Sequence, residues 1–252
     1  MSVYLITHKP FEQPKVKGYK SILVGAYKGH SFGDLFDDEN DNISKKNAHY
    51  CELTGVYWLW KNTTDQYIGI THYRRRFTNH FEDNGVISES DLLKVLAKYD
   101  IIMPFKRTMH TSIEKHYCEE SGYKKDLNKV KEIIVSKYPE YASVYDQVMK
   151  GNTSYFYNMM ICKKSLYDSY CEWLFDILFE LEKDTNLDGY NDYQKRIYGF
   201  ISERLLTVWV LKNNLKVFEM GVVNPEEKFA FPKNILVRLK RVIMYHKKML
   251  LG

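Results

Sequence analysis

The residues best suited to chemistry stand together in one short segment, His72-Tyr73-Arg74-Arg75-Arg76. This segment directly follows residues 67–71, a β-rich apolar run. Adjacent arginines repel one another, and a multiply charged anion held by bidentate guanidinium contacts is one natural compensation. A diphosphate is such an anion. The alternative is a surface loop whose arginines pair with nearby carboxylates, and the sequence leaves both interpretations open.

Asn158 and Tyr157 belong to an aromatic segment, residues 155–160, at the end of a predicted strand. An amide among aromatic rings is suited to hydrogen bonding and stacking with a sugar or a base. A packed edge of the hydrophobic core has the same composition, so this second interpretation also stays open.

Glu203 is a carboxylate inside the otherwise apolar residues 200–210. Burial there would raise its pKa and suit it to base catalysis. The alternative is that Arg204 or Arg196 neutralises it, and in proteins this pairing is the more common explanation for such a residue.

The common catalytic motifs are missing from the sequence. It contains no GxGxxG, GxxxxGK[ST], HExxH or GxSxG, so dinucleotide-binding, P-loop, zinc-protease and serine-hydrolase interpretations lose their direct support. Five acidic residues between Asp34 and Asp41 lack the spacing of a calcium loop, and we expect them to be solvated. The four cysteines are widely spaced without a CxxC pair, so we expect free thiols.

Strands and helices alternate along the chain and must position these residues. The expected strands are residues 3–7, 21–25, 67–71, 100–104, 155–161 and 215–223, and the expected helices are residues 47–60, 91–99, 125–137, 139–150, 166–183 and 190–211. This order predicts an α/β fold with a mostly parallel sheet flanked by helices and a helical C-terminal part. Such sheets bind ligands at the carboxyl ends of their strands, so the loops after Thr7, Gly25, Thr71 and Pro104 are of most interest.

The charge of the chain is unevenly distributed. The net charge is +5, but residues 228–252 hold seven Lys and Arg and no Asp or Glu, so the rest of the chain carries −2. A slightly acidic body argues against a nucleic-acid partner, which usually meets a basic face. Apolar positions in residues 228–252 recur at helical spacing. They predict a basic amphipathic helix that either binds an anionic membrane surface or docks on the domain.

Membrane insertion and secretion are not expected from the sequence. No stretch approaches the roughly 20 apolar residues of a membrane-spanning helix. The N-terminus has no basic start followed by a long apolar run. We therefore expect a cytoplasmic protein, which would lie peripherally on the inner face of the cell membrane if the basic helix of residues 228–252 binds an anionic leaflet.

Several longer strings carry a family resemblance. They are Ile6-Thr7-His8-Lys9-Pro10-Phe11, residues 41–44, 50–55, 57–62 and 67–77, and the later residues 157–159, 171–175 and 202–205. Together they resemble a bacterial family of capsular or exopolysaccharide biosynthesis glycosyltransferases that carries the His72-Tyr73-Arg74-Arg75 motif. The resemblance covers nearly the whole chain.

The resemblance implies one GT-A-like (Rossmann-like) domain over residues 1–227, followed by the helix of residues 228–252. It implies transfer of a hexosyl group, galactosyl or galactofuranosyl, from a UDP-sugar to a lipid-linked oligosaccharide. Many GT-A enzymes hold a metal with an aspartate-any-aspartate pair, whereas this chain has Thr71-His72-Tyr73-Arg74 at the corresponding strand end. Arginines can replace the charge of the metal, so we expect no tightly bound cofactor and no required divalent metal.

The resemblance also suggests a role for each candidate residue. The expected nucleotide and diphosphate contacts are Thr7, His8, Lys9, Tyr73, Arg74 and Arg75, the sugar or acceptor contacts are Asn158 and Tyr157, and the catalytic residues are His72 and Glu203, with Asp192 as second choice for the base. Two other classes compete. A non-catalytic carbohydrate-binding or scaffolding subunit would not need His72, Arg74 and Glu203, and an RNA-binding protein is disfavoured by the −2 charge of the body.

Overall fold

One mixed sheet of eight strands forms the centre of the computed structural model, which describes residues 1–78, 86–226 and 243. Across the sheet the strands follow the order β3 (Leu35–Phe36), β2 (Tyr19–Leu23), β1 (Ser2–Thr7), β4 (Tyr67–His72), β9 (Met160–Lys163), β6 (Ile101–Pro104), β10 (Val217–Val223) and β5 (Arg76–Thr78). All run in one direction except β9 and β5, which are antiparallel to their neighbours. The predicted mostly parallel sheet is therefore confirmed.

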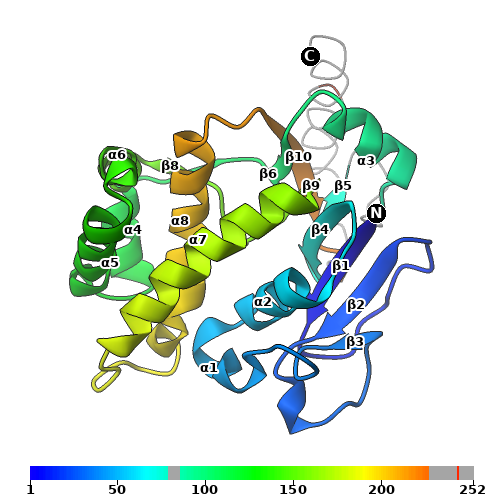
Figure 1. Cartoon of the computed structure of the whole chain (residues 1–252), viewed down its shortest axis with the longest axis horizontal. Coiled ribbons are helices and arrows are strands. Elements are labelled where there is room, and N and C mark those ends of the chain that lie inside the picture. The colour runs from blue at the N-terminus through cyan, green and yellow to red at the C-terminus, as the bar shows by residue number, and fades with distance from the viewer. Residues whose placement is uncertain (79–85, 227–242, 244–252) are drawn as a thin grey trace.

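Both faces of the sheet are buried, because its strands carry apolar residues on alternate sides. Tyr4 and Ile6 of β1 belong to the larger hydrophobic cluster, and Val3 belongs to a second cluster. Helices α2 (Leu53–Asn62) and α7 (Lys164–Lys183) lie over the first face, and α3 (Glu89–Leu96) lies over the second (Figure 1). Burial on both faces explains why the strands read as continuous apolar runs.

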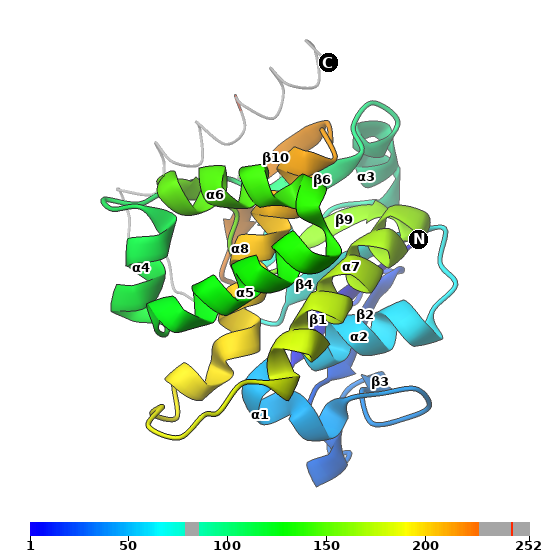
Figure 2. The same cartoon turned by 60° about the vertical axis from the view of Figure 1, so that its left-hand side comes forward.

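A group of helices extends the domain beside the sheet. Helices α4 (Ile113–Glu120), α5 (Lys124–Lys137) and α6 (Ala142–Lys150) gather near α8 (Ile197–Lys212), away from β2 and β3 (Figure 2). The short strands β7 (Arg107–Thr108) and β8 (Thr153–Ser154) pair with each other close by. The long helices α7 and α8 give the C-terminal half its expected helical character. The helix expected for residues 228–252 falls outside the described residues, apart from residue 243.

Two expected elements are interrupted, and both interruptions lie at residues with positive φ. The helix expected over 47–60 is divided into α1 (Asn47–Tyr50) and α2 by Cys51, whose φ is 53°. The strand expected over 155–161 begins only at Met160, because Tyr157 and Asn158 have φ values of 79° and 49°. These backbone conformations fit neither a helix nor a strand.

Smaller differences concern unexpected short elements and the ends of expected ones. Helix α4 lies where no helix was expected, and α8 starts at Ile197 rather than at residue 190, after the 3₁₀ turn η4 (Gln194–Arg196). The short strand β5 was not expected. The patterns therefore identified the principal elements more securely than their ends, since caps and tertiary contacts decide where an element stops.

Asp37 corrects the expectation that the acidic loop is solvated. Its side chain is fully buried. It accepts hydrogen bonds from the backbone N–H groups of Gly25 and Ala26 and from the hydroxyl of Ser44. The carboxylate therefore fixes the loop that follows β2 by satisfying backbone donors.

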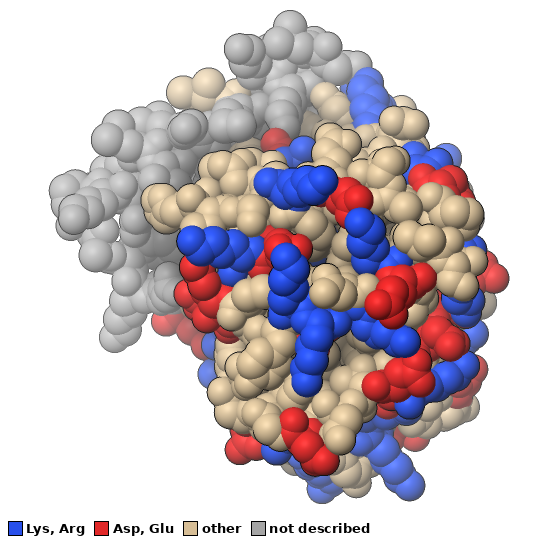
Figure 3. All heavy atoms as spheres, turned by 90° about the vertical axis from the view of Figure 1, so that its left-hand side faces the viewer, with Lys and Arg blue, Asp and Glu red and all other residues tan. Residues whose placement is uncertain are grey.

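The charged side chains at the surface and the four cysteines are arranged as the sequence predicted for a folded domain with free thiols. Basic and acidic side chains are interspersed over the face seen in Figure 3. The four cysteines are unpaired, and Cys162 and Cys171 are buried, which confirms free thiols. Among the described residues, no helix has the length and apolar character needed to cross a membrane.

Candidate active site

A pocket of about 810 Å³ opens where β1 and β4 end, at the carboxyl edge of the sheet. Its wall includes residues 6–8 at the end of β1, the turn 72–75 at the end of β4, the junction of α1 and α2, and parts of η4 and α8. The charged side chains that line it are Arg74, Arg75, Arg107, Arg196 and Arg204, with Glu52, Glu120 and Glu203. Arginines outnumber glutamates, so the pocket is electropositive when its histidines are neutral and suits an anionic ligand.

The three adjacent arginines separate because a tight turn joins β4 to β5. The backbone N–H groups of His72 and Arg75 donate to each other's carbonyl oxygens and close this turn. Arg74 and Arg75 line the pocket. Arg76 is only 5% exposed and donates to two backbone carbonyl oxygens. The pocket therefore receives two of the three guanidinium groups, and the third ties the turn to the rest of the fold.

Thr7, His8 and Tyr73 form the corner of the pocket next to β1. The rings of His8 and Tyr73 meet edge to face, with centroids 5.3 Å apart. The hydroxyl oxygen of Thr7 accepts a hydrogen bond from the Lys9 N–H at 3.2 Å, which turns the chain at the strand end. Burial, reinforced by the charge of Arg74, lowers the pKa of His8. This corner therefore presents a neutral imidazole and an aromatic ring beside the arginines.

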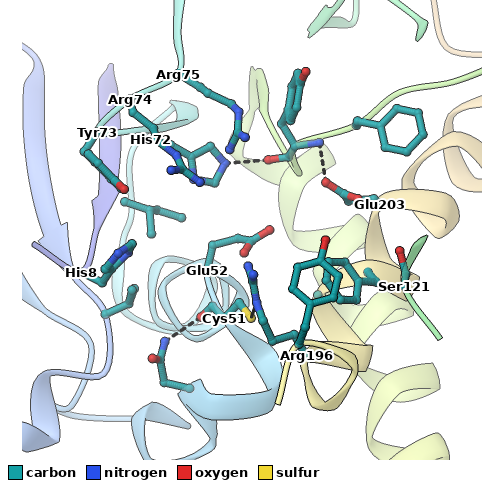
Figure 4. A pocket seen from close by; sticks show the side chains of 18 of the residues that line it. His8, Cys51, Glu52, His72, Tyr73, Arg74, Arg75, Ser121, Arg196 and Glu203 are labelled. Atoms are coloured by element: carbon teal, nitrogen blue, oxygen red, sulfur yellow. Dashed lines mark hydrogen bonds between the residues drawn. The ribbon is translucent and has the colours of Figure 1, made fainter. Parts of the chain in front are cut away.

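Two hydrogen bonds hold Tyr157 at the pocket wall, and Figure 4 draws them as the dashed lines that start at His72 and Glu203. His72 Nε2 donates to the Tyr157 carbonyl oxygen at 2.6 Å, and the Tyr157 N–H donates to Glu203 Oε1 at 2.9 Å. Burial lowers the pKa of His72 to about 4, so the neutral ring carries its proton on Nε2. Positive φ is rare for a residue with a side chain, and these two contacts hold Tyr157 in that conformation.

The Glu203 carboxylate has a second partner in Arg204. Its Oε2 lies 3.0 Å from Arg204 Nη1, and the two side chains are 17% and 2% exposed. Burial raises the pKa of Glu203 in spite of this cation. The Arg204 guanidinium also lies over the rings of Tyr117 and Phe156. The structure thus shows the pairing that the sequence left open, together with the raised pKa.

Glu52 is a pocket carboxylate that the sequence analysis did not single out. It follows Cys51, the residue that interrupts the helix, and Asn47 Nδ2 donates to the Cys51 carbonyl oxygen at 2.8 Å. The break turns Glu52 toward the space between His8 and Arg196 (Figure 4). A signal was present in the sequence. Glu52 stands four residues before Val56, on the apolar face of the expected helix, where a carboxylate is out of place.

Asn158 lies behind the pocket rather than on its wall. The side chain is 3% exposed. Its Nδ2 donates to Glu52 Oε1 at 2.7 Å and to the Gly199 carbonyl oxygen at 3.4 Å. The expected contact of Asn158 with a sugar is thus replaced, in this arrangement, by a contact that positions Glu52.

The pocket brings together most of the residues expected from the sequence. Those that line it are Thr7, His8, His72, Tyr73, Arg74, Arg75, Tyr157 and Glu203. Lys9 does not, because it is exposed and pairs with Glu226 at 3.4 Å. Asp192 is fully exposed and pairs with Lys195, outside the pocket lining. Besides Glu52, the residues missed from sequence include Arg107, His116 and Arg196.

The cationic side chains that line this pocket are arginines. Within residues 1–78 and 86–226, no three His, Cys, Asp or Glu side chains gather as ligands for a metal ion. Arg74 and Arg75 instead place positive charge at the carboxyl end of β4, where an anion would meet it. Guanidinium groups in such a position can stabilise charge that develops on a departing phosphate.

Comparisons with known proteins found a family model and a solved structure that are similar to this chain. A family model described as a domain of unknown function, DUF4422, matches residues 2–214. The chain is also similar to the apo structure of WbbM, described as a bifunctional glycosyltransferase, with a TM-score of 0.81 and 29% identity. The similarity covers 92% of this chain and 47% of that chain, so this chain spans about half the length of WbbM. No curated protein matches. The predicted GT-A-like fold is confirmed by the structural match.

Proposed function

The chain belongs to the DUF4422 family, and from this premise we propose that it is a glycosyltransferase. The proposed reaction transfers a hexosyl group, galactosyl or galactofuranosyl, from a UDP-sugar to a lipid-linked oligosaccharide in capsular or exopolysaccharide biosynthesis. One observation carries this proposal. In a GT-A-like fold, Arg74 and Arg75 line a large pocket at the adjoining carboxyl ends of β1 and β4.

The β1 side of the pocket would hold the donor. The uridine would lie against the corner formed by Thr7, His8 and Tyr73, and the diphosphate would face Arg74 and Arg75. During transfer the bond between the anomeric carbon and the diphosphate breaks, and its electron pair leaves with UDP. The two guanidinium groups stabilise the charge that grows on the leaving oxygen. We therefore propose a reaction that does not require a divalent metal.

The opposite side of the pocket would hold the acceptor. Phe156, Tyr193 and Phe200 line it there, and aromatic rings are suited to the apolar faces of sugars. Arg107 and His116 both line the pocket beside the Phe156 ring and offer hydrogen-bond donors to acceptor hydroxyls. This division gives the pocket a donor end near β1 and an acceptor end near α4 and α8.

A lipid-linked acceptor would bring the enzyme to the inner face of the membrane. Residues 228–252 contain seven Lys and Arg and no acidic residue. A basic residue near an anionic leaflet contributes about 1 kcal/mol of attraction. We propose on this sequence ground that the protein is cytoplasmic and peripherally bound. The same ground disfavours RNA as the partner, because the rest of the chain is slightly acidic.

UDP release from a panel of UDP-sugars, including UDP-galactose and UDP-galactofuranose, tests the proposal. One donor should raise the Tm and be hydrolysed slowly, because water can replace the acceptor. A ligand at one hundred times its Kd stabilises a protein by about 2.7 kcal/mol, which is easily measured. A chain that binds carbohydrate but releases no UDP from any donor would instead be the non-catalytic subunit.

A further inference from the structure

We infer that Glu52 is the base that removes the proton from the acceptor hydroxyl, an inference that rests on the proposed glycosyl transfer. The inference follows from a juxtaposition in the pocket. Glu52 faces the cavity between the arginine turn and Arg196, whereas Glu203 is engaged by Arg204 and by the backbone of Tyr157.

Glu52 has the access that a base needs. Its side chain is partly exposed and lines the pocket, and Figure 4 shows its carboxylate pointing into the open space. Asn158 Nδ2 holds Oε1 at 2.7 Å. Among the residues that the structure describes, the Glu52 side chain has this one hydrogen bond and no ion pair. A neutral donor therefore orients the carboxylate, and a proton on this carboxylate breaks no ion pair among the described residues.

Glu203 is in the opposite situation. Its Oε1 accepts from the Tyr157 N–H and its Oε2 pairs with Arg204. A proton on Glu203 would leave the Arg204 guanidinium, only 2% exposed, without its counter-charge. Breaking a buried pair in this way typically costs several kcal/mol. Glu203 is therefore a positioning residue that holds Tyr157, and its raised pKa reflects burial.

The remaining carboxylates are less suitable. Asp192 is fully exposed and does not line the pocket. Glu120 does line it, but this residue is exposed at the last position of α4, where water competes for its proton. Glu52 also lies near enough to Arg196 for the two side chains to interact electrostatically.

The proposed step is a single displacement. The acceptor O–H bond breaks and its proton moves to the Glu52 carboxylate. The acceptor oxygen forms a bond to the anomeric carbon, and the bond from that carbon to the diphosphate breaks, with its electron pair leaving on UDP. Arg74 and Arg75 stabilise the diphosphate. The anomeric configuration is therefore inverted.

The test compares matched variants, each measured with the UDP-sugar that the wild-type chain hydrolyses. Glu52→Gln keeps an oxygen for Asn158 and should fold normally, bind UDP normally by thermal shift, and lose at least about 100-fold in kcat. Formate should restore part of the rate of Glu52→Ala, because a small carboxylate can occupy the space. Glu119→Gln removes the same charge from an exposed ion pair outside the pocket and should have the wild-type rate.

Three outcomes would overturn the inference. The first is a Glu52→Gln rate near that of the wild type, and the second is a product that retains the anomeric configuration. The third is rescue by formate of Glu203→Ala but not of Glu52→Ala, which would give the base role to Glu203. A wild-type chain that releases no UDP from any donor would overturn the proposed function itself, and the base assignment with it.

Discussion

His72 and Glu203 come from segments 131 positions apart in the printed sequence, yet they hold the two ends of one residue. His72 donates to the Tyr157 carbonyl oxygen, and Glu203 accepts from the Tyr157 N–H. Tyr157 has a φ of 79°, and the Arg75 guanidinium lies 4.5 Å from the centre of its ring. The end of β4 and helix α8 are thus connected through a strained residue that also contacts the turn carrying Arg74 and Arg75.

Removing Glu203 should destabilise the fold as well as lower activity. Glu203→Ala leaves Arg204 buried without its counter-charge, and breaking such a pair costs about 3–5 kcal/mol. The measurement is the free energy of unfolding in urea. Adding Arg204→Met to Glu203→Ala should recover much of the loss, because the unpaired charge is then gone. If Glu203→Ala unfolds at the same urea concentration as the wild type, the ion pair does not stabilise the protein.

The buried His72 should make stability depend on pH. Burial lowers its pKa from 6.5 to about 4, so below pH 6.5 the unfolded chain binds a proton that the folded chain does not. Stability should therefore fall as the pH decreases from 6.5 to 4, by at most about 3 kcal/mol for this group, and level off below pH 4. Above pH 6.5 the His72 imidazole is neutral in both the folded and the unfolded chain, so its contribution to stability is constant.

Comparison with His72→Gln isolates this contribution. Glutamine retains a side-chain N–H for the Tyr157 carbonyl oxygen but does not titrate. Burial also lowers the pKa values of His8 and His116. The dependence of stability on pH that these two residues produce is therefore present in both the wild type and His72→Gln. The wild type should lose more stability than the variant between pH 6.5 and pH 4. Equal slopes in urea titrations across this range would contradict the assigned pKa of His72.

The sequence predicted the elements that apolar periodicity defines. The strands that became β1, β4 and β6 are buried on both faces, so nearly every residue in them is constrained to be apolar and the pattern is strong. The position of Arg74 and Arg75 could also be predicted, because it needs only the end of β4. A local sequence pattern was therefore sufficient to predict the place of a residue that directly follows a buried strand.

The rest of the site depends on departures from those patterns. Cys51 and Tyr157 have positive φ, a state that neither residue prefers, and each is held there by side chains distant in sequence or on a neighbouring turn. Apolar spacing continues through both positions, so it predicted an unbroken helix and an unbroken strand. Glu52 and Asn158 directly follow these two residues, and their contact exists only because both elements are interrupted.

The basic C-terminal segment gives a prediction that is independent of the pocket. If residues 228–252 bind the membrane, the protein should sediment with phosphatidylserine vesicles but not with neutral ones, and added salt should release it. Truncation after Pro232 should abolish sedimentation and leave UDP release nearly unchanged. A truncated protein that melts well below the intact chain, with no vesicle binding by either, would show that the segment packs on the domain.

The arginine turn allows a sharp test of metal independence, because its three arginines have different surroundings. Arg74→Ala and Arg75→Ala each remove a charge from the pocket lining and should lower the rate of UDP release by about 100-fold, while EDTA leaves the wild-type rate intact. Arg76→Ala is the matched control. It removes the same charge from a buried side chain bonded to the backbone, so it should lower the Tm while the folded fraction keeps its KM for the donor. Activity that EDTA abolishes and manganese restores would show that a metal, and not the pair Arg74 and Arg75, neutralises the diphosphate.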